Sequence, residues 1–286
     1  MEKTFIGVDL GGTKVHAARV MGGVISKSVY RLLPKDNGDA QIVVNLIMEV
    51  VNLLMNEKVS AIGIGLPSMV DSEKGIVYDV QNIPSWKEVH LAEILESQFH
   101  LPVFMDNDAN CYALGEAYYG LGKDSDFMVG LTIGTGLGGG IVCQRKIING
   151  ASGSSGEFGI IPYLDKTLED YCSGQFFKDY YASNGEELAK KARAGDVSAL
   201  KAFQEFGLHL GNAIKVIMAT VDPQMIVIGG SVALSNDLFE KAMRQSISDY
   251  AFERSIKKIK IQFSETNHMA ILGASSLCFQ NEFVLG

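Results

Sequence analysis

Hydrophobic positions along the chain follow two alternating patterns. Short apolar runs of strand length lie at residues 5–10, 15–20, 24–30, 59–65, 101–105, 127–133, 139–144, 224–230 and 259–263. Segments with helical spacing of apolar residues lie at 39–57, 88–99, 108–119, 186–220, 231–249 and 269–281. Strands that alternate with helices are typical of an α/β protein, so we predict this class. The first three runs follow one another with only short turns, which predicts an antiparallel meander.

A faint internal repeat relates two of these regions, residues 5–20 and 129–144. Each has an apolar strand, a polar residue near its end (Asp9 and Thr132), a glycine-rich turn and a second apolar strand. Two similar hairpins in the two halves of a chain indicate duplicated domains. At about 150 residues per domain, the length of 286 residues agrees with two domains.

The net charge of −8 argues against a general nucleic-acid binder, which needs a basic face. It leaves room for an anionic small ligand, because backbone N–H groups bind phosphate without any net positive charge. We therefore expect no nucleic-acid partner.

Several features predict a cytoplasmic location without a membrane partner. Residues 1–12 lack the apolar core of a signal peptide, and no stretch approaches the roughly 20 apolar residues of a membrane span. Cys111, Cys143, Cys172 and Cys278 are far apart and form no CxxC pair. A reducing compartment fits this cysteine usage better than a disulfide framework.

Two glycine-rich loops are candidate phosphate sites. Gly134, Gly136 and Gly139 satisfy GxGxxG, but the loop runs into a strand-like segment rather than a helix, which excludes the dinucleotide-binding interpretation. Residues 9–14 (DLGGTK) lack the spacing of a Walker A loop. Both loops are therefore predicted to be hairpin turns, for which glycine is in any case the default residue.

The placement of both turns beside polar strand ends favours phosphate binding over plain turn formation. Without Cβ atoms, glycines let backbone N–H groups approach a phosphate closely, and threonine hydroxyls add donors. The residues that offer these groups are Gly11, Gly12, Thr13, Thr135, Gly136, Gly138 and Gly139. Asp9, at the end of a buried strand, is suited to hold Mg²⁺ through a water molecule.

Four polar side chains crowd the predicted strand-to-helix junction at 105–110. They are Asp106, Asn107, Asp108 and Asn110. Helix capping accounts for one such residue, since Asp and Asn satisfy the free N–H groups of a first turn. Four in six positions indicate a further role, which capping does not exclude.

These motifs together resemble the ROK family (repressor, open reading frame, kinase) of the sugar kinase/actin/Hsp70 superfamily of ATPases. Five segments carry the resemblance besides DLGGTK: 133–142 (IGTGLGGGIV), 227–232 (VIGGSV), 65–86, 106–116 (DNDANCYALGE) and 155–159 (SGEFG). The resemblance spans almost the whole chain in the expected order. It implies a two-lobed ribonuclease H-like/actin-like ATPase fold. The first lobe would comprise residues 1–112 with the C-terminal helix 268–286, and the second residues 113–267.

The resemblance also implies roles for individual residues. Asp108 would be the catalytic base that takes the proton from the 6-hydroxyl of a sugar. Asp106 faces the other way if the strand alternation continues, so we expect it to be a cap or a supporting residue. Sugar-binding residues would be Gly65, Asn82, Asn107, Asp108, Glu157 and Glu169. Nucleotide-binding residues would be Asp9, Gly11, Gly12, Thr13, Lys14, Thr135, Gly136, Gly138, Gly229 and Gly230. ATP and Mg²⁺ would be the cofactors, with Asp9 reaching Mg²⁺ through water.

The chain departs from the family pattern at one site. Most members carry a histidine and a cysteine-rich stretch that bind structural zinc, whereas here Ile160 takes the histidine position and residues 163–171 hold no cysteine. We therefore expect no zinc site, with Cys172 as a small buried residue. Ile160 could enlarge or dry the pocket for a 2-acetamido group, or it could signal decayed activity.

The function implied is ATP-dependent phosphorylation of the 6-hydroxyl of a hexose or N-acetylhexosamine. Such an enzyme would be of the glucokinase or the N-acetylmannosamine/N-acetylglucosamine kinase type, acting in carbohydrate metabolism as a homodimer. The alternative is a sugar-sensing regulator or a catalytically silent sugar-binding protein of the same family. A family repressor carries a DNA-binding domain ahead of the first phosphate loop, and here that loop begins within a dozen residues of Met1.

Overall fold

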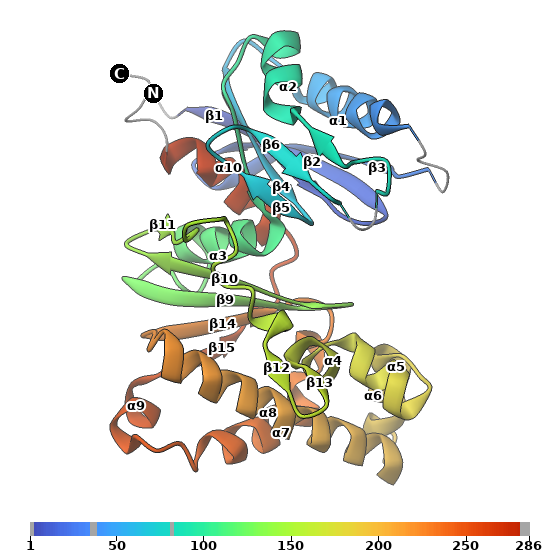
Figure 1. Cartoon of the computed structure of the whole chain (residues 1–286), viewed down its shortest axis with the longest axis vertical. Helices are drawn as coiled ribbons and strands as arrows, with labels where there is room; N and C mark the ends of the chain where they lie inside the picture. Colours follow the sequence, from blue (N-terminus) through green and yellow to red (C-terminus); the bar gives the residue numbers. More distant parts are fainter. Residues whose placement is uncertain (1–2, 35–38, 81–82, 281–286) are drawn as a thin grey trace. The chain divides into compact units, whose positions relative to one another are not determined.

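The computed structural model describes residues 3–34, 39–80 and 83–280, and Figure 1 labels most of their helices and strands. The chain divides into two compact units. Unit 1 comprises Met1–Lys123, Gly140–Ser155 and His268–Gly286, and unit 2 comprises Asp124–Gly139 and Gly156–Asn267. This division differs from the boundary at residue 112 that the sequence suggested, since 113–123 and 140–155 fall in unit 1. A boundary at 112 would cut helix α3 (Asp108–Tyr119), which is continuous and packs on α10 (Met269–Gln280).

Unit 1 is built on a five-stranded sheet with the order β3-β2-β1-β4-β8. Its strands are β1 (Thr4–Leu10), β2 (Lys14–Met21), β3 (Val24–Leu32), β4 (Val59–Leu66) and β8 (Val103–Asn107). The first three strands pair antiparallel, which confirms the predicted meander. β4 is parallel to β1, and β8 is parallel to β4. The carboxyl ends of β1, β4 and β8 therefore meet at one edge of this sheet.

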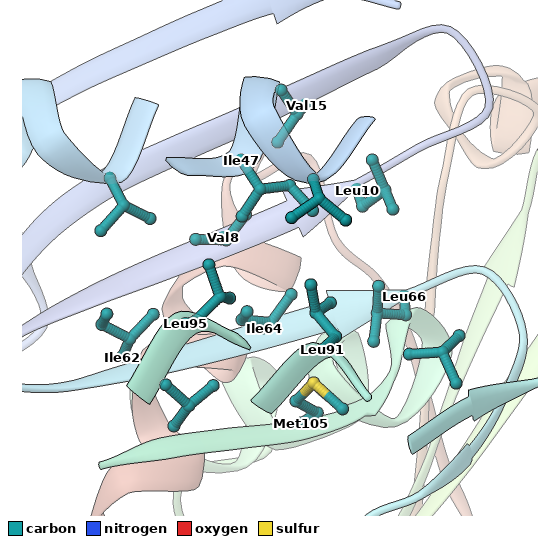
Figure 2. Packing of buried hydrophobic residues seen from close by; sticks show 14 of the residues in the cluster. Val8, Leu10, Val15, Ile47, Ile62, Ile64, Leu66, Leu91, Leu95 and Met105 are labelled. Atoms are coloured by element: carbon teal, nitrogen blue, oxygen red, sulfur yellow. The ribbon is translucent and has the colours of Figure 1, made fainter. Parts of the chain in front are cut away.

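One face of the unit 1 sheet packs against α1 (Ala40–Leu54) and α2 (Leu91–Phe99) (Figure 1). Figure 2 shows side chains of the three parallel strands interdigitating with those of the two helices, such as Ile64 with Leu91 and Leu95. Burial of apolar surface contributes about 25 cal/mol per Å², so this core stabilises unit 1.

The opposite face of the unit 1 sheet is covered by α10, which in turn packs against α3. Two glycines make these contacts possible because their backbones touch. A Cβ atom on Gly63 of β4 would lie 1.8 Å from the carbonyl oxygen of Ala274, and one on Gly273 of α10 would lie 1.6 Å from that of Cys111. No side chain larger than hydrogen fits at either position without backbone movement.

The second sheet has the order β11-β10-β9-β14-β15. Its strands are β9 (Phe127–Ile133), β10 (Leu137–Cys143), β11 (Lys146–Ile147), β14 (Met225–Gly229) and β15 (Lys260–Phe263). β14 is parallel to both β9 and β15. In this sheet β9 lies between β10, which follows it in the chain, and the parallel strand β14. In the first sheet β1 lies in the same way between β2 and the parallel strand β4. The duplication predicted from the two similar hairpins is thus present in the strand order.

The helices of unit 2 are α4 (Leu168–Cys172), α5 (Gly174–Tyr181), α6 (Gly185–Arg193), α7 (Val197–Thr220), α8 (Asn236–Ile247) and α9 (Glu253–Lys258). The sequence suggested one helix over 186–220, but α6 and α7 are separate. Gly195 adopts a φ of +90°, and the side chain of Asp196 accepts the N–H of Ala199 at 2.8 Å to start α7. Within the described residues, no helix has the length and apolarity that crossing a membrane requires.

The remaining elements are short. A three-stranded sheet consists of β5 (Met69–Asp71), β6 (Ile76–Tyr78) and β7 (Glu88–Val89), and a hairpin of β12 (Pro162–Tyr163) and β13 (Lys166–Thr167). Single turns of 3₁₀ helix are η1 (Phe158–Ile160) and η2 (Ala233–Ser235). Two of these elements adjoin candidate site residues, since Glu157 directly precedes η1 and β13 leads into α4, which carries Glu169.

Candidate active site

The carboxyl edge of the unit 1 sheet brings three of the predicted residues into a row. In the strand register Asp9 of β1 lies beside Gly65 of β4, which lies beside Asp106 of β8. Neighbouring strands are about 4.8 Å apart, so the backbones of Asp9 and Asp106 are about 10 Å apart. Gly65 separates the two carboxylates, and a Cβ there would lie 3.2 Å from the sulfur of Cys111 on α3.

Asn107 is the N-cap of α3. Its side-chain oxygen accepts the N–H of Ala109 at 2.8 Å, and its amide nitrogen donates to the carbonyl of Ser68 at 3.3 Å. Asp108, half-buried, is the first residue of the helix. The positive end of the helix dipole favours a negative group at this position. The cap is therefore Asn107 and not Asp106. Capping by Asp106 would require the helix to start at residue 107, whereas α3 starts at Asp108.

Asp106 is instead the centre of a buried hydrogen-bond network. One carboxylate oxygen accepts the backbone N–H of Asn107 at 2.7 Å and the side-chain amide of Asn110 at 2.8 Å. The other accepts the amide of Asn149 at 3.1 Å, and that amide also reaches Ser72 Oγ at 3.3 Å. Burial raises the pKa of Asp106, and these three donors partly oppose the shift. The network ties residue 149 to the β8–α3 junction, which the sequence did not indicate.

Asp9, the last residue but one of β1, is half-buried. Burial raises the pKa of Asp9 to about 6, although the positive charge of Lys14 acts in the opposite direction. The ionised carboxylate is thus incompletely compensated by the protein's own charges. Oxygen ligands are those that Mg²⁺ prefers, and a cation at this site would supply the missing compensation. The residues present fit a water-coordinated Mg²⁺.

The first glycine turn joins β1 to β2. The N–H of Gly11 donates to the carbonyl of Lys14 at 2.9 Å, which closes the turn. Gly12, Thr13 and Lys14 are exposed. The turn therefore offers a hydroxyl, an ammonium group and glycine backbone to an anionic ligand.

The second glycine turn follows β9 in unit 2. The N–H of Gly134 donates to the carbonyl of Gly136 at 3.0 Å, while Thr135 is exposed and Gly138 is half-buried. Gly229 of β14 lies beside Thr132 in the register, so the turn after β14 lies next to this loop. Gly230 there has a φ of +93°, and its Cβ would lie 2.5 Å from the carbonyl oxygen of Ile133. Both features require glycine.

Two acidic residues lie close together in unit 2. Glu157 precedes η1 and is half-buried. Burial raises the pKa of Glu157, and the negative charge of Glu169 raises it further. Glu169, on α4, is exposed, and its Oε2 accepts the backbone N–H of Leu137 at 2.8 Å. The sequence pointed to both acids but not to this bond with the glycine loop.

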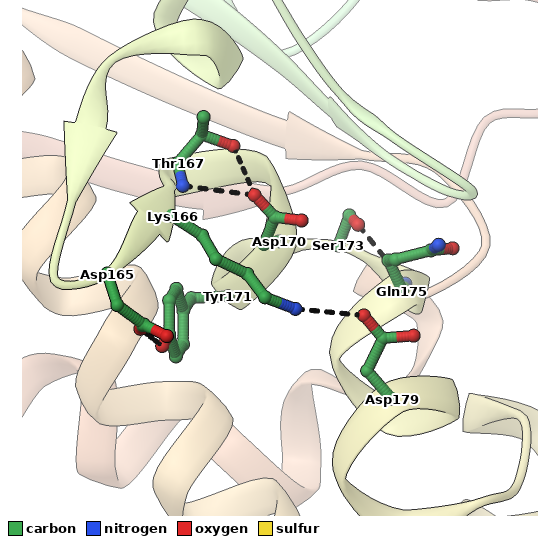
Figure 3. Close-up of polar contacts among 8 residues, drawn as sticks. All are labelled: Asp165, Lys166, Thr167, Asp170, Tyr171, Ser173, Gln175 and Asp179. Carbon is green, nitrogen blue, oxygen red and sulfur yellow. Dashed lines mark hydrogen bonds and ion pairs between the residues drawn. The ribbon is translucent and has the colours of Figure 1, made fainter.

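Side-chain hydrogen bonds and an ion pair join the residues of the segment 165–179, which overlaps the region expected to lack a zinc site (Figure 3). Oδ2 of Asp170 accepts both the N–H and the hydroxyl of Thr167, at 3.0 and 2.6 Å, and thereby closes the first turn of α4. The hydroxyl of Tyr171 donates to Asp165. Among the described residues no group of three or more His, Cys, Asp or Glu side chains could hold a metal ion. Ile160 is 71% exposed on η1.

Two single residues near the predicted site have packing roles. Cys172 is fully buried, as predicted, and burial raises the pKa of its thiol. Trp86 lies at the end of the segment 65–86 that resembles the family's sugar loop; it is fully buried and its ring N–H donates to the carbonyl of Ala40 at 3.0 Å, so it has a packing role. Asn82, expected to bind sugar, lies outside the described residues.

The model of one protein family, described as the ROK family, matches residues 5–281. The chain belongs to the ROK family. Among curated ROK relatives, the glucokinase of Thermotoga maritima is 28% identical over 304 residues, which span 95% of this chain and 96% of that one. The xylose repressor of Caldicellulosiruptor bescii is also 28% identical, over 94% of this chain but 76% of its own length. Relatives of similar identity therefore include both kinases and regulators.

A solved structure with the same fold is that of a ROK family glucokinase from Streptomyces griseus in complex with glucose and AMPPNP. It is 27% identical, covers 97% of this chain and 99% of its own, and superposes with a TM-score of 0.82. The chain is thus a mixed α/β protein with the actin-like ATPase fold of ROK kinases, which confirms the predicted fold class. The substrate of this chain is a separate question.

Proposed function

We propose that this chain transfers the γ-phosphoryl group of ATP to the 6-hydroxyl of a hexose or N-acetylhexosamine. The observation that carries this proposal is the position of Asn107 and Asp108. Asn107 ends β8 and Asp108 follows it, on the sheet edge that also holds Asp9, and the chain is similar to a ROK glucokinase solved with glucose and an ATP analogue. A carboxylate and an amide at this edge suit a sugar hydroxyl near a phosphate-binding turn.

Asp108 is the proposed catalytic base. Phosphoryl transfer requires mainly that the nucleophile is oriented and that charge is stabilised. The carboxylate of Asp108 would accept the proton of the 6-hydroxyl as that oxygen bonds to the γ-phosphorus and the bond between this phosphorus and ADP breaks. The products are the sugar 6-phosphate and ADP, and the proton then leaves Asp108 for water. Asn107, held by Ala109 and Ser68, would orient a neighbouring hydroxyl.

Each unit, taken by itself, has a glycine turn that we propose as a nucleotide contact. In unit 1 the proposed residues are Gly11, Gly12, Thr13 and Lys14, and in unit 2 they are Thr135, Gly136, Gly138, Gly229 and Gly230. Bound with ATP, Mg²⁺ would neutralise charge on the phosphates. Asp9 would orient a water molecule of that ion. Its incompletely compensated charge supports this role.

The sugar would be bound by Gly65, Asn82, Asn107, Glu157 and Glu169. Carboxylate oxygens accept hydroxyl protons well, and Glu169 is close enough to Glu157 for its negative charge to raise the pKa of Glu157, in addition to the larger effect of burial. The exposed apolar side chain of Ile160, three residues after Glu157, favours a substituent with an apolar methyl group, such as 2-acetamido, over a bare hydroxyl. We infer an N-acetylhexosamine or a hexose as substrate, acted on by a homodimer.

A sugar-sensing regulator is the second candidate, favoured by the similarity to xylose repressors. A regulator needs sugar binding but no turnover, so it has no use for a base at Asp108. The two candidates therefore differ in what a substitution at that position does.

The test is Asp108→Asn, which keeps the shape of the side chain and removes its basicity. ADP release in the presence of sugar should fall by a factor of roughly 10² or more, while calorimetric sugar affinity changes little. Asp39→Asn is a matched control, since Asp39 caps the first turn of α1 in the same unit and Asn caps equally well. Its activity should equal that of the wild type. Sugar binding without sugar-dependent ADP release in the wild type would favour the regulator.

A further inference from the structure

The glycine loop after β9 is restrained from one neighbouring segment, residues 169–174. Oε2 of Glu169 accepts the N–H of Leu137 at 2.8 Å, and the N–H of Gly174 donates to the carbonyl of Gly134 at 2.7 Å. Residues 169–174 thus hold both ends of the loop, and both contacts lie within unit 2. One of them depends on a side chain and can be removed by substitution.

The glycine content of this loop makes such restraints necessary for a defined conformation. Gly134, Gly136 and Gly138 have no side chains to pack, and glycine loses more conformational freedom on ordering than any other residue. Gly136 also leaves space for the carboxylate, because a Cβ there would lie 2.4 Å from Oε2 of Glu169. A loop of this composition binds an anion well only if its N–H groups are already oriented.

The helix that carries Glu169 is itself well anchored. α4 has only five residues, too few for an isolated helix. Its first turn is closed by Thr167 and Asp170, and Leu168 and Cys172 are fully buried. Ser173 then accepts the N–H of Gln175 at 3.1 Å and starts α5 (Figure 3). The position of the Glu169 carboxylate is therefore set by α4 rather than by a ligand.

We propose that Glu169 is a positioning residue for the loop at 134–138, so that nucleotide affinity depends on it even when no sugar is present. This rests on the proposed function, because it takes the loop as a phosphate-binding loop. It goes beyond the sugar contact proposed above, since a residue that only binds sugar has no influence on nucleotide binding in the absence of sugar.

Three substitutions separate positioning from charge. Glu169→Ala removes the acceptor. Glu169→Asp keeps the charge but withdraws the oxygens by one methylene, beyond the reach of Leu137 N–H. Glu169→Gln keeps an acceptor oxygen at the same reach without the charge. If the carboxylate mainly repelled phosphate, Glu169→Ala would bind nucleotide more tightly and Glu169→Asp would behave like the wild type. Positioning predicts weaker binding for both and near-normal binding for Glu169→Gln.

The experiment is calorimetric titration of each purified chain with Mg-ADP in the absence of sugar. We expect the dissociation constant to rise about three- to tenfold for Glu169→Ala and Glu169→Asp, as expected for loss of one hydrogen bond, and to stay within about twofold for Glu169→Gln. Glu186→Ala is the matched control, because Glu186 is an exposed glutamate on α6 of the same unit. It should bind Mg-ADP like the wild type.

Hydrogen exchange in the ligand-free proteins tests the same bond without any nucleotide. A peptide that spans residues 134–139 should exchange faster in Glu169→Ala and Glu169→Asp than in the wild type, Glu169→Gln and Glu186→Ala. Unchanged exchange and unchanged Mg-ADP affinity in Glu169→Ala and Glu169→Asp would overturn the inference while leaving the proposed kinase intact. Absence of Mg-ADP binding by the wild type would overturn both.

Discussion

Asp9 should destabilise the folded chain at neutral pH when no cation is present. Its pKa rises from 3.8 to about 6 on folding because burial of the carboxylate outweighs the opposing effect of the positive charge of Lys14. The protonated form is thus favoured in the folded state. The stability that protonation contributes is fully present below pH 3.8 and is lost as the pH rises through 6.

The size of this effect follows from the shift. About two pKa units at 1.36 kcal/mol each give an upper limit of about 3 kcal/mol, and partial exposure of Asp9 reduces the expected value to about 2 kcal/mol. Asp9→Asn has the same shape and cannot ionise. Relative to the wild type it should therefore be more stable by about 2 kcal/mol at pH 8, with the difference shrinking towards pH 4.

The assay is urea unfolding in buffers that contain a chelator, between pH 4 and pH 8. Asp124→Asn, an exposed aspartate, is the control for the chemical change and should show no such trend. If Asp9 mainly formed a stabilising ion pair with Lys14, Asp9→Asn would be less stable than the wild type, most of all at pH 8. That result, or a difference that does not vary with pH, would refute the reasoning.

Three further outcomes are expected. Gly230→Ala should lower the free energy of unfolding by more than Gly195→Ala. Both glycines have φ near +90°, but only at position 230 would the new Cβ meet a backbone atom, the carbonyl oxygen of Ile133. Equal losses of about 1–2 kcal/mol in urea unfolding would contradict this. Gly115→Ala should lower the melting temperature sharply, since the new Cβ on α3 would lie 2.1 Å from the carbonyl oxygen of Met269 on α10. An unchanged melting temperature would show that α3 and α10 can move apart at little cost. Sugar affinity measured by calorimetry should weaken as the pH falls through the raised pKa of Glu157, because protonation of the carboxylate removes a hydrogen-bond acceptor. In Glu157→Gln the affinity should depend less on pH. A wild-type affinity that does not vary with pH would count against Glu157 as a sugar ligand.

The main strands and longer helices were predictable because each carries its own local pattern. The apolar run at 127–133, for example, is β9 with the same bounds. The short elements were not predictable: α4 has five residues and β7 has two, so neither spans enough positions to show a period. They form because long-range contacts hold them, such as the packing of Leu168 and Cys172.

The candidate site was predictable as a set of motifs but not as a set of contacts. Asn107 caps α3 where Asp106 was considered for that role, because the choice depends on the residue at which β8 ends, and such boundaries are poorly encoded. The bond from Asn149 to Asp106 joins residues 43 positions apart, and the bond from Leu137 to Glu169 joins residues 32 apart. No local pattern signals such pairs.

ADP release by the purified chain with Mg-ATP tests the central proposal most directly. The panel is glucose, mannose, fructose, N-acetylglucosamine and N-acetylmannosamine, each measured against a blank without sugar and repeated with Asp108→Asn. The proposal predicts release well above the blank with at least one of these sugars, and its loss in Asp108→Asn. Release that is independent of sugar, or sugar-dependent release that persists in Asp108→Asn, would contradict it.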